Sequence, residues 1–105
     1  MIQHLPLFAV VPAFTVVPQE RYTAYEGGTV EVKFKMIGAG NDLKMAWYLD
    51  GQQLTASADY IEYGQDFLKL SDLITTDAGM YQLHVSNSVG DAQLAFELVV
   101  LPPRE

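Results

Sequence analysis

The 105-residue chain contains no cysteine, so no disulfide can hold it together. Small secreted domains usually contain at least one disulfide, because their hydrophobic cores are small. The chain also lacks the Asn-x-Ser/Thr sequence that accepts N-glycans, since Leu43 and Val89 follow Asn41-Asp42 and Asn87-Ser88. Both absences favour a cytoplasmic location for the protein.

Basic residues are few, because six lysines and arginines stand against 13 aspartates and glutamates, for a formal net charge of -7. Nucleic-acid phosphates and anionic lipids are bound by clustered Lys and Arg. The six basic residues are spread along the chain without forming a cluster: Arg21, Lys33, Lys35, Lys44, Lys69 and Arg104. The composition therefore predicts neither nucleic acid nor membrane among the partners.

Long apolar runs are missing as well, since none approaches the about 20 residues that span a bilayer. The apolar stretch near the amino end is interrupted by Pro6 and ended by Pro12, and no basic residue precedes it. A signal peptide would need a basic start and a small-residue cleavage site. We therefore interpret residues 1–11 as a linker or contact segment.

Apolar residues alternate with polar ones over several short segments, as half-buried strands require. The segments are 30–36, 81–86 and 94–100, in which Val30, Tyr81 and Leu94 each begin an apolar series at every second position. Turn residues separate these segments, and no stretch keeps a helical period, apart from a short turn expected near residues 75–77. The pattern predicts an all-β, antiparallel β-sandwich.

The spacing of a few core residues narrows the fold further. Trp47 lies 13 residues after Phe34, Leu83 lies 36 residues after Trp47, and Tyr81 precedes Leu83 by two positions. In immunoglobulin-type sandwiches a Trp packs over a bridge between the two sheets, and a Tyr two residues before the second bridge position fixes a corner. Here both bridge positions, Phe34 and Leu83, are apolar.

These motifs, in this order, resemble an intermediate-set (I-set) immunoglobulin domain over residues 12–101, followed by a linker at 102–105. The segments that carry the resemblance are Pro12 to Phe14, Glu26 to Met36, Trp47 to Gly51, Leu68 to Leu73, Asp77 to Tyr81, Asn87 to Gly90, and Leu98 with Val100. The missing cysteine pair departs from the family pattern. In this respect the chain is similar to the I-set modules of cytoplasmic muscle proteins such as titin, obscurin, myomesin and myosin-binding protein C.

The loss of the bridge is physically tolerable. A disulfide that closes a loop of this length stabilises by about 4 kcal/mol in chain-entropy terms, whereas burying a Phe or a Leu contributes roughly 1.5–3 kcal/mol each. We therefore expect a core built on Phe34, Trp47, Leu70, Tyr81 and Leu83. By the resemblance, the Tyr81 hydroxyl should bond to a backbone group near Asp77.

Residues with the spacing of a catalytic or metal site are not found. The two histidines, His4 and His84, are isolated, and Asp72 with Asp77 is a weak acid–base pair because the resemblance gives Asp77 a structural role at the corner. Glycine pairs lack the strand-to-helix setting of a phosphate loop. The sequence therefore predicts a protein that is not an enzyme and has no cofactor and no metal.

Two groups of residues are candidates for protein contact. Tyr48 and His84 are predicted to face outward on one sheet where charge is sparse, and aromatic residues are enriched at interfaces. The amino-terminal group has more apolar residues than a free linker needs: Leu5, Leu7, Phe8 and Val10. Strand edges expected at the first strands and at the last one could also support weak self-association.

The resemblance implies a non-enzymatic structural and interaction module of a large intracellular scaffold of the sarcomere or cytoskeleton. Its expected partners are neighbouring immunoglobulin or fibronectin-type modules and sarcomeric proteins. Two alternatives remain: an extracellular adhesion or receptor module that lacks its disulfide, and an engineered binding domain. Fold alone does not decide among them.

Overall fold

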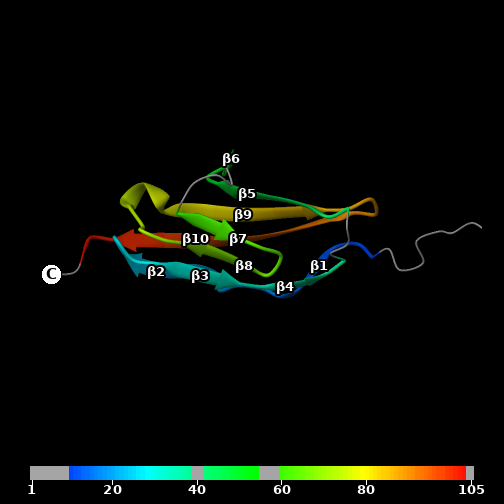
Figure 1. Ribbon diagram of the computed structural model, residues 1–105, viewed down its shortest axis with the longest axis horizontal. Helices are drawn as coiled ribbons and strands as arrows, with labels where there is room; N and C mark the ends of the chain where they lie inside the picture. The colour runs from blue at the N-terminus through cyan, green and yellow to red at the C-terminus, as the bar shows by residue number, and fades with distance from the viewer. Residues whose placement is uncertain (1–9, 39–41, 55–59, 104–105) are drawn as a thin grey trace, which may run out of the picture.

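The computed structural model describes residues 10–38, 42–54 and 60–103, and it folds into two layers of strands (Figure 1). The element bounds are β1 (Ala13–Val16), β2 (Arg21–Tyr25), β3 (Val30–Lys33), β4 (Lys35–Ile37), β5 (Lys44–Leu49), β6 (Gln52–Gln53), β7 (Ile61–Tyr63), β8 (Phe67–Leu70), the 3-10 turn η1 (Thr75–Asp77), β9 (Gly79–Ser86) and β10 (Asp91–Leu101). The predicted all-β sandwich is confirmed, and the short turn falls at residues 75–77.

Each layer contains strands from both halves of the chain. One layer has the order β3-β8-β7, with β4 continuing the path of β3 and pairing with β1. The other layer has the order β2-β10-β9-β5-β6. Every strand pair is antiparallel except β2 with β10, which run parallel. Phe34 separates β3 from β4, and its N–H donates to the carbonyl of Asp66.

The residues expected in the core lie between the two layers. Phe34, Trp47, Leu70, Tyr81 and Leu83 are each at most 2% exposed. Alternation decides this arrangement, because Val30 and Val32 are buried while Glu31 and Lys33 point to solvent. The same alternation buries Leu94, Phe96 and Leu98 on β10.

Aromatic rings join the two layers at the position where a disulfide would stand. The Phe34 ring lies edge-on to Trp47 with 6.0 Å between centroids, and Trp47 lies edge-on to Phe96 at 6.1 Å. Trp47 is paired in register with Leu83 on the neighbouring strand. The Phe96 ring also stacks on Tyr81 at 5.1 Å. Both former bridge positions therefore flank one indole ring.

The corner before β9 is held by the pair Asp77 and Tyr81. The buried Tyr81 hydroxyl donates to the Asp77 carbonyl, as the resemblance implied. The Asp77 carboxylate accepts from the N–H of Ile74 at 2.9 Å, which closes the 3-10 turn. Burial, and secondarily the negative charge of Asp77, raises the pKa of Tyr81 well above its usual range.

The structure corrects the expectation that the last strand forms an open edge. Residues 97–101 of β10 pair with residues 21–25 of β2, so β2 forms that edge of the sheet. The reason is that the chain crosses between the layers after β1, at Val17 and Pro18, and then runs beside β10. Only the first half of β10 has no strand on that side among the described residues.

Leu83→Ala should lower the free energy of unfolding by about 2–5 kcal/mol, because it removes a fully buried side chain opposite Trp47. Urea denaturation followed by Trp47 fluorescence would measure the loss. Val17→Ala is the control, since Val17 is 66% exposed, and should change stability by less than about 0.5 kcal/mol. An unchanged midpoint for Leu83→Ala would contradict the core assignment.

Stability above about pH 10 should depend on Tyr81, because a tyrosine in the unfolded chain ionises near that pH whereas the folded chain holds the neutral form. The raised pKa therefore adds stability that is complete below about pH 10 and is lost as the pH rises further. Tyr81→Phe should show a shallower loss between about pH 9 and 11.5. Equal slopes for both proteins in urea titrations would refute this role.

Candidate protein-contact surfaces

The outer face of the five-stranded sheet brings Tyr48 and His84 together. Tyr48 lies on β5 and His84 on β9, and their ring centroids are 4.8 Å apart at an angle of 45°. Both side chains point outward because Trp47 and Leu83 between them point into the core. The two residues that the sequence proposed for contact are therefore direct neighbours on an exposed surface.

Strand register arranges the surrounding side chains in cross-strand rows. Tyr48 is opposite Gln82, which is opposite Ala95, and Ala46 is opposite His84, which is opposite Gln93. None of these residues is a carboxylate or an ammonium group, in a chain with a net charge of -7. We call this surface the sheet patch, defined by Ala46, Tyr48, Gln82, His84, Gln93 and Ala95.

Among the described residues, the charged groups that border the sheet patch lie at its two ends. Lys44 and Asp91 flank Ser86 at one end, and Asp50 and Glu97 lie beside Met80 at the other. Glu97 is already paired, because the Arg21 Nε lies 2.8 Å from its carboxylate. An uncharged centre between charged ends is the composition of an interface core with a polar rim.

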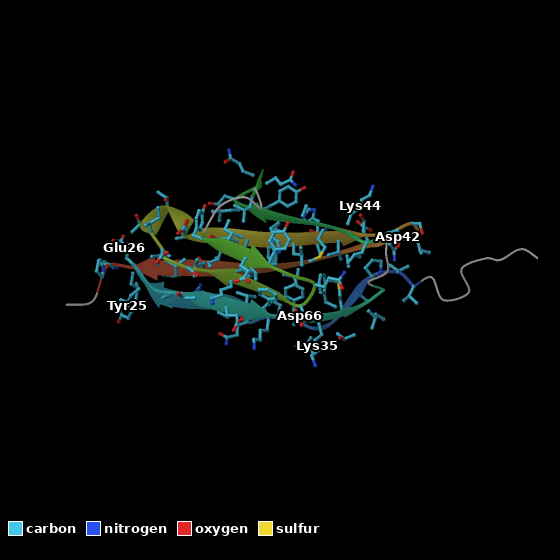
Figure 2. All side chains as sticks on the ribbon, viewed as in Figure 1. Tyr25, Glu26, Lys35, Asp42, Lys44 and Asp66 are labelled. Carbon is cyan, nitrogen blue, oxygen red and sulfur yellow. The ribbon has the colours of Figure 1, made fainter. Side chains whose placement is uncertain are left out.

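The opposite sheet presents a mixed-charge surface. Lys69 is in register between Glu31 and Glu62, and Lys33 lies 3.9 Å from Glu31. Exposed pairs of this kind contribute little to stability or binding. A shallow pocket of about 470 Å³ beside this face is lined by Lys35, Met36, Gln65 and Asp66. Figure 2 labels Lys35 and Asp66 on this side of the sandwich. The four residues that line the pocket do not form a recognisable ligand site.

Asn87 fastens the start of the described chain to the end of the sandwich. Its Nδ2 donates to the carbonyl of Val10 at 2.6 Å and lies 3.3 Å from that of Gly38, while its Oδ1 accepts from the N–H groups of Val89 and Gly90. Val10 is 43% exposed. The sequence assigned Asn87 only to a turn, and its Asn-x-x-Gly spacing carried no sign of this long-range contact.

The rest of the amino-terminal candidate segment cannot be placed. Leu5, Leu7 and Phe8 lie outside the described residues. Val11 is next to Gly90, where a Cβ atom would come within 2.8 Å of a Val11 methyl group. Val10 and Val11, which the sequence placed in the preceding segment, therefore contact the domain.

A second shallow pocket, of about 250 Å³, lies beside this junction and is lined by Asp42, Lys44, Ser86, Asn87 and Ser88. Figure 2 shows Asp42 and Lys44 near the same end of the sandwich. The N–H of Ser88 donates to the Asp42 carboxylate and lowers the pKa of Asp42. This contact ties two loops together.

Asp72 and Asp77, which the sequence offered as a weak acid–base pair, both lie within the described residues 10–38, 42–54 and 60–103. Asp77 is buried and bonded to Ile74, whereas Asp72 is exposed, so the two carboxylates have separate environments. The described residues contain no group of three or more His, Cys, Asp or Glu that could hold a metal ion. They also contain no helix long and apolar enough to cross a membrane.

The β2 strand turns the backbone groups of two of its residues away from β10. The N–H of Glu97 donates to the Glu20 carbonyl, and the N–H of Glu26 donates to that of Leu101. In a parallel pair, these two bonds determine which residues of β2 face β10 with their backbone groups. Tyr22 and Ala24 bond to β10, while Arg21 and Thr23 direct their N–H and C=O groups away from it. An open edge of this kind can accept another strand.

Comparisons with known proteins match nearly the whole described sandwich. The family model described as Immunoglobulin I-set domain covers residues 12–100. A human protein named Peroxidasin homolog is 31% identical over an alignment of 103 residues, and the match covers 94% of this chain and 7% of that protein. The chain thus spans a small part of the curated relatives that it matches.

Solved structures of similar fold come from two settings. A chain in the crystal structure of a titin M10–obscurin-like 1 Ig complex is 26% identical, with a TM-score of 0.77 and coverage of 91% of this chain and 98% of that one. Drosophila OTK extracellular domains 3–5 are also 26% identical, with a TM-score of 0.72 and coverage of 86% and 31%.

Asn87→Asp should release the chain entry at Val10, because it keeps the Oδ1 acceptor for Val89 and Gly90 but removes the Nδ2 donor. We expect faster amide exchange near residues 11–14 and a loss of about 0.5–1.5 kcal/mol of stability. Val89→Ala, a change at an exposed position of the same turn, is the control. Unchanged exchange in Asn87→Asp would show that the bond to Val10 does not hold the segment.

Proposed function

The chain belongs to the immunoglobulin I-set family, and on that premise we propose that it is a non-enzymatic, load-bearing contact module of a larger intracellular scaffold. A sarcomeric or cytoskeletal setting is favoured by two features. The chain has no cysteine, which suits a reducing compartment. A structure of similar fold comes from a complex of titin with an obscurin-like protein.

The observation that carries the load-bearing role is the parallel pairing of β2 with β10. The described chain starts at one end of the sandwich and finishes at the opposite end (Figure 1). Tension between these ends would slide β2 along β10, since the two strands run in the same direction. Their hydrogen bonds then share the load together instead of opening one after another, which raises the resistance to unfolding.

Contact with other protein domains is the second part of the proposal. The sheet patch and the open β2 edge offer two different surfaces, one made of side chains and one made of backbone groups. Neighbouring immunoglobulin or fibronectin-type modules and sarcomeric proteins are the proposed partners. The net charge of -7 disfavours nucleic acid and anionic lipid as alternatives.

An extracellular adhesion or receptor module is the second candidate function. It is favoured by the similarity to the extracellular domains of Drosophila OTK. Protease treatment of intact and permeabilised cells that express the parent protein would separate the two settings. Cleavage only after permeabilisation supports the intracellular scaffold, and cleavage in intact cells supports the extracellular module.

A pair of proline substitutions on β2 tests the load-bearing role. Ala24→Pro removes an N–H that faces β10, whereas Thr23→Pro removes one that faces away, so Thr23→Pro is the matched control. In single-molecule pulling from both ends, Ala24→Pro should unfold at least about fivefold faster at a given force, since one lost hydrogen bond costs about 1 kcal/mol.

Equal unfolding rates for the two variants would mean that the β2–β10 pair does not carry the load. Each variant should first be shown to keep the sandwich by circular dichroism. Chemical unfolding without force gives the second control. If Ala24→Pro only lowers stability locally, the ratio of its unfolding rate to that of Thr23→Pro will be the same without force as with it.

A further inference from the structure

We propose that the sheet patch binds the sheet patch of a second copy of this chain, with the two copies related by a twofold axis. This rests on the proposed function as a protein-contact module and names both the partner and the surface. In a twofold contact the same surface is used on both molecules, so it must be complementary to itself. The register of β5, β9 and β10 provides that complementarity.

The buried row formed by Trp47, Leu83 and Leu94 marks the middle of the patch. The twofold axis lies above this row, parallel to the sheet and perpendicular to the strands. Each strand then lies antiparallel to the same strand of the second copy. Positions equally far before and after the middle row then face each other. Ala46 faces Tyr48 of the second copy, and Gln82 faces His84 of the second copy.

The facing side chains complement each other in size and chemistry. The Tyr48 ring covers the small Ala46 of the second copy, and Gln93 covers the small Ala95 of the second copy, so large residues meet small ones on both outer strands. On the central strand, the Gln82 carboxamide can donate to or accept from the imidazole of His84 in the second copy. No charged group is buried at the centre of this contact.

At the charged ends of the patch, one contact joins opposite charges and one joins like charges. The same operation brings Lys44 to Asp50 of the second copy, and Lys44 has no ion-pair partner among the described residues. Asp91 comes to Glu97 of the second copy, whose carboxylate is already paired with Arg21. An orientation turned by half a revolution would bring Lys44 to Asp91 and Asp50 to Glu97, so the rim charges are equivalent in the two orientations, and the contact of Gln82 with His84 on the central strand defines the proposed axis.

The size of the patch indicates a weak dimer. The two rows of the patch and the charged row at each end, at about 6.8 Å each, over three strands at about 4.8 Å each, give a footprint of roughly 27 Å by 14 Å. That is well below the about 800 Å² per molecule of a standard stable interface. Sheets that pack face to face cross at about 30°, so the central strand β9 keeps the closest alignment. Such a contact suits neighbours held at high local concentration.

Sedimentation equilibrium of the full 105-residue chain tests the proposal. The concentrations run from about 10 μM to 1 mM, because a contact of this size should dissociate at concentrations at which a standard-sized interface stays associated. Ala95→Arg places a large cation where Gln93 of the second copy would pack, and should weaken dimerisation at least about tenfold. Ile37→Arg adds the same charge at a position 49% exposed on β4, in the other layer, and should leave dimerisation unchanged. Gln93→Arg repeats the test if Ala95→Arg does not fold.

The absence of native cysteine allows the register itself to be tested. An equimolar mixture of the single variants Gln82→Cys and His84→Cys should form a disulfide-linked heterodimer under mild oxidation. Each variant alone should crosslink much more slowly, because identical positions are offset along β9. Faster crosslinking within either single variant would overturn the proposed axis.

Two further outcomes would overturn the proposal. One is a chain that stays monomeric up to about 1 mM, beyond the range of a specific weak contact. The other is a dimer that is lost in Thr23→Pro but kept in Ala95→Arg, since this would place the contact at the β2 edge. Neither result changes the unfolding rates of Ala24→Pro and Thr23→Pro under force, so failure of the dimer and failure of the load-bearing function are distinguishable.

Discussion

Contact between Trp47 and the rings of Phe34 and Phe96 joins the two layers of this sandwich at its centre. The chain of rings continues outward, from Phe34 to Phe14 on β1 and from Phe96 to Tyr22 on β2. Each such pair adds about 0.5–1.5 kcal/mol beyond the burial of its area. Four edge-on contacts together therefore match the about 4 kcal/mol of the missing disulfide. The strands proposed to bear load and to present the contact surfaces are joined to this chain of rings.

The same ring contacts have one cost. The indole Nε1 of Trp47 is buried and has no hydrogen-bond partner among the described residues. An unpaired buried donor costs about 1–3 kcal/mol, so the packing of the indole ring must outweigh this. The ring is 2% exposed and is edge-on to aromatic rings from both layers. Its area and position explain how a Trp can be stable here without that hydrogen bond.

The sequence predicted features that depend on local period and spacing, and missed features that depend on where the chain crosses. Alternation placed Val32, Leu83 and Phe96 inside because side chains on a strand alternate between faces. It also predicted that Tyr48 and His84 face the same side. The parallel pairing of β2 with β10 was missed, since nothing in the alternation of Tyr22 and Ala24 tells which layer they join. The contact from Asn87 to Val10 was missed because it spans most of the chain.

The arrangement separates the resistance to force from the capacity to bind. On β2, Tyr22 and Ala24 use their backbone groups to hold β10, while Arg21 and Thr23 direct theirs outward. The sheet patch lies on β5, β9 and β10, and its side chains point away from the core that the rings fill. Binding at the patch therefore breaks none of the hydrogen bonds between β2 and β10. A module built this way can hold a second protein and remain under tension, because the two tasks use different atoms.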